Sequence, residues 1–234
     1  MSVVYPNAGN IGGGGFLVYR LNNGDIGTLD FREKAPEKSY RDMYIDNIEG
    51  ELKVDDKRSK IGHLASGVPG SVDGMVKIYD KFSTVDWKTL LEPSIKVARE
   101  GFGVTEKQAK GLNNVKKSLV SANDHPIPFI KEDPWKVGDI LTQKNLANTL
   151  EEIKKSKRDG FYKGAVAELI INEMKSGGGI ITQSDLDNYS SVWREPVIGY
   201  FKNHKIISMG PPSSGGIALV QLLHGAEPVS YTHL

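Results

Sequence analysis

The sequence predicts an α+β protein whose helix-rich middle is bracketed by strand pairs. Near the N-terminus, residues 16–21 and 26–31 read as strands, and Asn22-Asn23-Gly24-Asp25 between them is typical of a hairpin turn. In the middle of the chain, apolar residues recur at the spacing of amphipathic helices. Residues 193–209 then predict two more strands, joined by a turn near Asn203.

Composition narrows the classes of partner. The chain has 234 residues and a formal net charge of +1, so it has no basic excess and we expect no nucleic-acid partner. No apolar run approaches the ~18 residues of a membrane-spanning helix, so we expect no membrane span. Hydrophobic residues make up 38% and charged residues 25%, which is typical of a globular domain.

Few residues could hold a metal or cofactor. Cysteine is absent, which excludes disulfides, thiolate metal sites and a cysteine nucleophile. The histidines are scattered and form no zinc-site spacing: His63, His125, His204, His224 and His233. We therefore expect neither a metal nor a cofactor.

After the first strand pair the chain becomes polar. Residues 37–60 predict a short helix at 40–44 followed by a surface loop. Gly67-Val68-Pro69-Gly70 predicts a turn, and the apolar spacing that follows predicts a helix at 72–81. The buried stripe of that helix is expected to contain four residues: Val72, Met75, Val76 and Tyr79.

Further helices are predicted at 87–101, from 105, from 142, from 161 and at 182–189. Thr105 and Gln108 fit a capping box, and Thr182 is expected to cap the short last helix. The apolar side of 87–101 holds Leu90, Leu91, Ile95 and Ala98. Residues 123–134 predict a loop, and the basic run 154–158 is expected to face solvent.

The motif GPPSSGGI at 210–217 lies between a predicted strand and a predicted helix, as a phosphate-binding loop does. Gly216 and Ile217 occupy the places where such a loop needs lysine and a magnesium-binding hydroxyl. A nucleotide-binding α/β domain is therefore the weaker interpretation. The favoured one is a Pro-stiffened turn in which Ser213 or Ser214 caps the next helix.

Arg32 follows the second strand, just before a loop that Pro36 helps to enforce. With a side-chain period of two, the strand presents two opposite faces: Leu29 and Phe31 on one, and Thr28, Asp30 and Arg32 on the other. A guanidinium at a strand end can bind a carboxylate through two parallel hydrogen bonds. A surface ion pair with Asp30 or Glu33 explains the same residue, and spacing leaves both interpretations open.

Four sequence blocks carry a resemblance to a known family: VVYPNAGNIGGGGF, DFREKAP, HLASGVPGSVDG at 63–74 and GPPSSGGI at 210–217. In this order and at these spacings, they resemble the large subunit of γ-glutamyltranspeptidase. The resemblance runs from about Val3 to about Leu223, so we expect a partial large-subunit domain over residues 1–223. It does not extend into residues 224–234, where Gly225 and Pro228 interrupt a helical pattern.

The resemblance implies a fold, a reaction and a site residue. The fold would be part of the αββα sandwich of N-terminal nucleophile hydrolases. The enzyme would hydrolyse or transfer the γ-glutamyl group of glutathione and related compounds through a threonine acyl-enzyme. Arg32 falls on the arginine that binds the α-carboxylate of the γ-glutamyl substrate. Family members are exported, so the resemblance implies a periplasmic or extracellular parent protein, although this chain shows no signal peptide.

The resemblance also identifies what this chain lacks. The family's nucleophile becomes the N-terminus of a small subunit when the precursor cleaves itself, and no residue here matches that threonine. We expect the chain alone to be inactive, to show no autoprocessing, and to require the missing small subunit as its partner. Exposed sheet edges would then favour association. The alternative function is a non-catalytic module that binds amino-acid carboxylates through Arg32.

Overall fold

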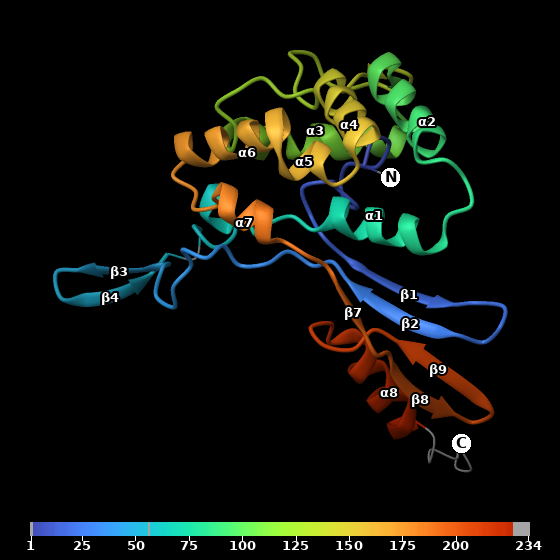
Figure 1. Cartoon of the computed structure of the whole chain (residues 1–234). Coiled ribbons are helices and arrows are strands. Elements are labelled where there is room, and N and C mark those ends of the chain that lie inside the picture. The colour runs from blue at the N-terminus through green and yellow to red at the C-terminus, as the bar shows by residue number, and fades with distance from the viewer. Residues whose placement is uncertain (1, 56, 227–234) are drawn as a thin grey trace, which may run out of the picture.

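The computed structural model describes residues 2–55 and 57–226 and confirms the α+β class. Figure 1 shows a group of helices on one side of a small sheet, with a separate strand pair and helix toward the C-terminal end. The sheet is antiparallel with the order β1-β2-β7, and its strands are Phe16–Arg20, Ile26–Asp30 and Val192–Arg194. Leu29 in the central strand pairs with Leu17 on one side and with Trp193 on the other.

The helices of the middle lie over this sheet. They are α1 (Ser71–Phe82), α2 (Trp87–Glu100), α3 (Glu106–Ser121), α4 (Lys144–Ser156), α5 (Asp159–Tyr162), α6 (Gly164–Ser176) and α7 (Gln183–Asn188). A 3₁₀ turn at His63–Ala65 precedes α1. The capping box at Thr105 is confirmed, and Thr182 forms a second one with Asp185. Within residues 2–55 and 57–226, none of the helices combines the length and the hydrophobicity of a membrane-spanning segment.

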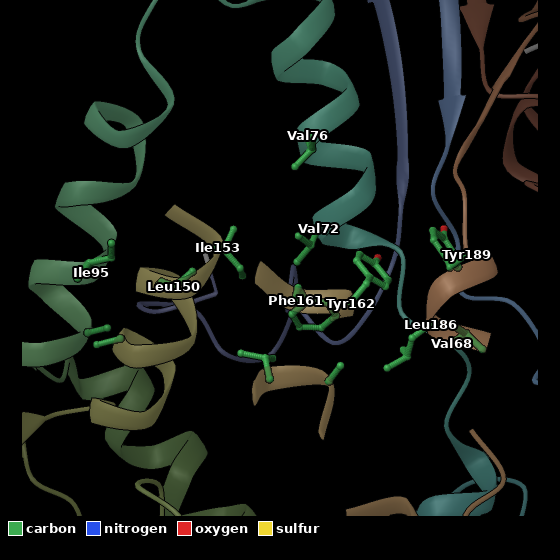
Figure 2. Packing of buried hydrophobic residues seen from close by; sticks show 14 of the residues in the cluster. Val68, Val72, Val76, Ile95, Leu150, Ile153, Phe161, Tyr162, Leu186 and Tyr189 are labelled. Carbon is green, nitrogen blue, oxygen red and sulfur yellow. The ribbon is translucent and has the colours of Figure 1, made fainter. Parts of the chain in front are cut away.

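The main core lies between these helices (Figure 2). Ile95 and Ala98 of α2 are buried with Leu150 and Ile153 of α4. The indole Nε1 of Trp87 donates a hydrogen bond to the carbonyl oxygen of Ile153 at 3.0 Å, which joins the same two helices. Burying large side chains in this way supplies most of the stabilisation that offsets chain entropy.

Three short strand pairs lie outside the main sheet in the described part of the chain. β3 (Ile45–Ile48) pairs with β4 (Glu51–Val54), β5 (Phe102–Gly103) pairs with β6 (Ile140–Leu141), and β8 (Val197–Phe201) pairs with β9 (His204–Ser208). The final helix, α8 (Gly215–Ala226), contacts the β8–β9 pair. In Figure 1 the β3–β4 pair projects away from the helices. Of the tail predicted at 224–234, residues 227–234 lie outside the described part of the chain.

The helix predicted at 40–44 is wrong: that segment forms turns and leads into the β3–β4 hairpin. Glu49 and Gly50 have φ values of 54° and 87°, and two successive positive values are what a tight two-residue hairpin turn requires. The chain therefore reverses direction at Glu49 and Gly50. The ion pair of Arg58 with Asp46 at 2.7 Å ties this hairpin to the chain that follows it.

Other helix details also differ from expectation. Met75 and Leu90 are 50% and 47% exposed rather than buried. The helix expected from 142 begins at Lys144, and the one expected from 161 is interrupted at Lys163, between α5 and α6. The prediction that the run 154–158 faces solvent is wrong for Arg158, which bonds to a buried carboxylate.

Candidate functional site

Arg32 lies immediately after β2, and its backbone is held from both sides. Its amide N donates to Asp30 Oδ1 at 3.1 Å, and its carbonyl oxygen accepts the hydroxyl of Tyr189 at 2.8 Å. The second carboxylate oxygen of Asp30 accepts from Arg194 Nε at 2.8 Å. Asp30 therefore connects the end of β2 with the neighbouring strand β7 and fixes where the Arg32 side chain starts.

The Arg32 side chain is half exposed, at 54%, and is oriented by two contacts. Nε donates to Glu33 Oε2 at 3.1 Å, and the guanidinium lies 5.6 Å from the centre of the Phe16 ring. Among residues 2–55 and 57–226, no hydrogen bond involves Nη1 or Nη2. The outer edge of the fork is therefore available for an end-on, two-hydrogen-bond contact with a carboxylate.

The two faces predicted for β2 are only partly confirmed. Leu29 and Phe31 are buried as expected, but Thr28 is fully buried and Asp30 is nearly so. Thr28 Oγ1 donates to the carbonyl oxygen of Arg194 in the paired strand β7 at 2.7 Å. The expected surface ion pair exists with Glu33, whereas Asp30 pairs with Arg194.

The glycine-rich block allows backbones to approach closely around Arg32. A Cβ on Gly14 would lie 2.5 Å from the carbonyl oxygen of Phe31, and one on Gly70 would lie 2.2 Å from that same oxygen. The carbonyl oxygen of Gly13 accepts the amides of Gly70 and Ser71 at 2.8 and 3.0 Å. Because these residues have no Cβ, the backbones can approach this closely, and Gly70 brings the HLASGVPGSVDG block into the same contact.

A buried ionic network lies behind this segment. Asp73 is 3% exposed, and its Oδ1 accepts from Arg158 Nε at 2.9 Å. Its Oδ2 accepts from the Ser191 amide at 2.8 Å and from the Ser191 hydroxyl at 2.5 Å. Arg158 Nη2 also donates to three carbonyl oxygens at the end of α7: those of Leu186, Asp187 and Tyr189. This network joins α1, α5 and α7.

The electrostatic state of the network follows from these contacts. Burial alone would raise the pKa of Asp73, but the hydrogen bonds from Ser191 and the nearby Lys77 and Arg158 outweigh it and hold that pKa below its usual range. Asp73 is therefore an anion at neutral pH. Burial, reinforced by the charges of Asp73, Asp30 and Glu33, raises the pKa of the Tyr189 hydroxyl, which therefore stays protonated and can donate.

The GPPSSGGI motif has the local order of a phosphate-binding loop but not its surroundings. It follows β9 and precedes α8, yet β8 and β9 are antiparallel neighbours rather than strands of a parallel sheet. Ser213 Oγ accepts the amide of Gly215, the first residue of α8, at 3.3 Å. Within the described residues, no group of three or more His, Asp or Glu side chains is placed to hold a metal ion.

Sequence reasoning missed Tyr189, Asp73 and Arg158. Asp73 lies within the HLASGVPGSVDG block, next to Val72 of a predicted helix face, and a carboxylate beside a buried stripe is a signal for a buried partner. The sequence places Arg158 in a basic run because its partner lies 85 residues away and local spacing does not reveal it. Tyr189 carries no local signal beyond its place at the end of a short helix.

A pocket of about 280 Å³ adjoins the same region. Its lining consists of Lys34, Ala35, Glu37, Val68, Ser184, Asp185, Asn188 and Tyr189. Arg32 is not part of this lining. The outer end of its guanidinium lies on an open surface in the described part of the chain.

Comparison with known proteins places these features in context. The family model of gamma-glutamyltranspeptidase matches residues 1–233. The glutathione hydrolase proenzyme of Escherichia coli (strain K12) is 42% identical over 229 residues, which cover 97% of this chain and 39% of that protein. That of Bacillus subtilis (strain 168) is 36% identical over 224 residues, covering 95% and 38%. The chain thus spans about two fifths of the length of these relatives.

Solved structures of gamma-glutamyltranspeptidases also match this chain. The gamma-glutamyltranspeptidase of Helicobacter pylori superposes with a TM-score of 0.93 at 44% identity, covering 99% of this chain and 66% of that one. The enzyme of Pseudomonas nitroreducens, complexed with L-DON, gives 0.87 at 36% identity, covering 99% and 69%. A cephalosporin acylase from Bacillus halodurans gives 0.83 at 21% identity, covering 99% and 43%, and shares the fold.

Proposed function

Because the chain belongs to the γ-glutamyltranspeptidase family, we propose that it forms part of the large subunit of a glutathione hydrolase and binds the γ-glutamyl donor through Arg32. One observation carries this proposal. The guanidinium is held by Glu33 and Phe16, while its two terminal nitrogens have no hydrogen-bond partner among the described residues. That edge fits the two oxygens of the donor's α-carboxylate.

The proposed reaction is an acyl transfer. The hydroxyl of a threonine at the N-terminus of the small subunit attacks the γ-carbonyl carbon, and the amine of the donor leaves with a proton. The resulting ester then passes its γ-glutamyl group to water or to an amino acid. Arg32 contacts the opposite end of the donor from the reacting carbonyl. Its contribution is therefore to bind and orient the substrate rather than to take part in bond formation.

The threonine and the groups that stabilise the oxyanion would come from the rest of the precursor. Two features of the chain support this. The site around Arg32 is open to solvent, and an enzyme that excludes water from its active site needs further residues to enclose that site. Within the described residues, the sheet β1-β2-β7 has three strands, with β1 and β7 at its edges, whereas the proposed αββα sandwich needs larger sheets completed by the small subunit.

The first test is to read the coding sequence beyond this chain and express the whole precursor. We expect a threonine-led small subunit, autoproteolysis of the precursor and γ-glutamyl hydrolysis. The 234-residue chain alone should show neither cleavage nor activity. Cleavage or hydrolysis by the chain alone would contradict the proposed division of the site.

The second test addresses Arg32 in the processed enzyme. Arg32→Ala should raise the KM for a γ-glutamyl donor roughly ten- to a hundredfold, because two charge-assisted hydrogen bonds are lost. Arg32→Lys keeps the charge without the fork and should give an intermediate KM. Arg20→Ala, which removes an exposed arginine from the adjacent strand β1, is the matched control and should leave KM unchanged. An unchanged KM in Arg32→Ala would refute the assignment.

The same free guanidinium edge supports a second candidate, a non-catalytic module that binds amino-acid carboxylates. Calorimetric titration of the chain separates it from the first. Millimolar or tighter binding of L-glutamate, absent for 4-aminobutyrate, which lacks the α-carboxylate, would favour the binding module. No binding of either would favour a site that forms only with the small subunit.

A further inference from the structure

We propose that Tyr189 is a positioning residue for donor recognition: its hydroxyl fixes the backbone of Arg32 and so aims the guanidinium at the donor carboxylate. This inference rests on the proposed function of Arg32. The direct contact is the hydrogen bond from the Tyr189 hydroxyl to the carbonyl oxygen of Arg32 at 2.8 Å. The two residues lie 157 positions apart in the sequence.

Arg32 lies between two backbone positions that are held by hydrogen bonds to other segments, so its own few contacts determine where it lies. Phe31 still belongs to a ladder, since its amide donates to the carbonyl oxygen of Gly15 at 3.0 Å. Lys34 is anchored to the next block, since its amide donates to the carbonyl oxygen of Val68 at 3.1 Å. Between these anchors, the Arg32 backbone bonds only to Asp30 and Tyr189 among the described residues.

Tyr189 is itself rigidly held, as a positioning group must be. Its ring stacks on Tyr162 with centroids 5.8 Å apart and an interplanar angle of 11°. The ammonium of Lys34 lies 5.1 Å from the centre of the ring. Its backbone carbonyl accepts Arg158 Nη2 at 2.7 Å, and Arg158 is bound to the buried Asp73. Figure 2 shows Tyr189 at the end of α7, near the strands.

The surrounding chain leaves space for this one hydroxyl. A Cβ on Gly70 would lie 2.0 Å from it, closer than any non-bonded contact permits. Glycine at this position therefore allows the phenol to reach Arg32 between α1 and β2. The chain of contacts runs from Asp73 through Arg158 and Tyr189 to Arg32, so the helical group sets the position of the proposed substrate-binding residue.

The test uses Tyr189→Phe in the full-length processed enzyme. Phenylalanine keeps the stacked ring and removes only the hydroxyl. We expect the donor KM to rise about three- to tenfold, the effect of one neutral hydrogen bond, with kcat changed less than about twofold. The inhibition constant of L-glutamate should rise by a similar factor, whereas that of 4-aminobutyrate should not change. A purely structural role would not produce this selectivity.

Two further variants sharpen the test. Tyr162→Phe removes the hydroxyl of the stacked ring, which donates to the Pro69 carbonyl rather than to Arg32, and should lower stability without changing KM. In an Arg32→Ala background, Tyr189→Phe should have no further effect on KM. If Arg32→Ala weakens binding but Tyr189→Phe does not, the positioning role of Tyr189 is refuted and the proposed function of Arg32 stands. If Arg32→Ala has no effect, the proposed function fails and this inference fails with it.

Discussion

Arg158 and Asp73 form an ion pair with Nε and Oδ1 2.9 Å apart, joining the start of α5 to the first turn of α1. The Asp73 side chain is 4% exposed and that of Arg158 is 25% exposed, so water screens the pair weakly. Arg158 also bonds to three carbonyl oxygens at the end of α7. One ion pair therefore fixes the relative positions of three helices.

Removing one partner of this pair should be costly. Asp73→Ala leaves the Arg158 guanidinium without its counter-charge, and we expect the free energy of unfolding to fall by about 3 kcal/mol. Lys110→Ala removes an exposed i,i+4 partner of Glu106, 2.7 Å away, and should change it by less than about 0.5 kcal/mol. Urea denaturation monitored by circular dichroism measures both. Equal effects would show that the buried pair has no special weight.

The same carboxylate should make stability depend on acid. The pKa of Asp73 is lower in the folded protein than its ordinary value, so its contribution is complete above about pH 4, the unfolded pKa. It is lost as the pH falls through the lower folded value. Wild-type stability should therefore decline below about pH 4 more steeply than that of Asp73→Asn. Melting temperatures between pH 2.5 and 7 test this, and parallel curves would contradict it.

Two glycine-to-alanine variants should act in opposite directions. At Gly70 a Cβ would collide with the Tyr189 hydroxyl and the Phe31 carbonyl, so Gly70→Ala should lower the free energy of unfolding by about 2 kcal/mol or more. At Gly111, inside α3, a Cβ meets nothing within 4 Å. Gly111→Ala should therefore raise stability by roughly 0.5–1 kcal/mol. Thermal melting compares the two, and a loss at both positions would argue against the steric explanation.

Asp185 should matter more than an ordinary helix cap. Its Oδ2 accepts the amide and hydroxyl of Thr182, both at 2.7 Å, and its Oδ1 accepts the Glu37 amide at 2.7 Å. Asp185→Ala therefore removes the capping interaction of α7 and the hydrogen bond that holds the Glu37 backbone. It should lower the free energy of unfolding by about 2 kcal/mol. Asp86→Ala removes only the exposed cap of α2 and should cost about 1 kcal/mol. Denaturant midpoints measure both losses of stability, and a larger loss for Asp86→Ala than for Asp185→Ala would contradict this prediction.

Local chemistry explains which elements could be predicted. The N-terminal hairpin, α2 and α3 carry their own turn, stop and capping signals: Asn22–Asp25, Gly101 and Thr105. The β3–β4 hairpin was missed because its turn uses Glu49, a residue that seldom adopts positive φ. The apolar spacing of α1 predicts a buried Met75, but it does not say how wide the buried face of the helix is, and Met75 is exposed.

The site was predictable only in part. Spacing placed Arg32 at the end of a strand, and the structure confirms that position. Its contact with Tyr189 and the hydrogen bond from Thr28 to Arg194 depend on chain segments about 160 residues away, and no local pattern encodes them. The binding role of Arg32 stays a prediction, for which the kinetic variants described above are the test.

The pairing of β2 with β7 also delays completion of the sheet while the chain is being synthesised. Thr28 and Arg194, which bond across the β2–β7 boundary, are separated by 166 residues. At ribosomal rates of about 5–20 residues per second, the N-terminal hairpin waits roughly ten to thirty seconds before its third strand is made. Throughout that interval one edge of β2 is unpaired, and a newly made chain is open to mispairing with its neighbours. Final placement of Arg32 is therefore a late event in folding, completed only after Tyr189 and β7 have been synthesised.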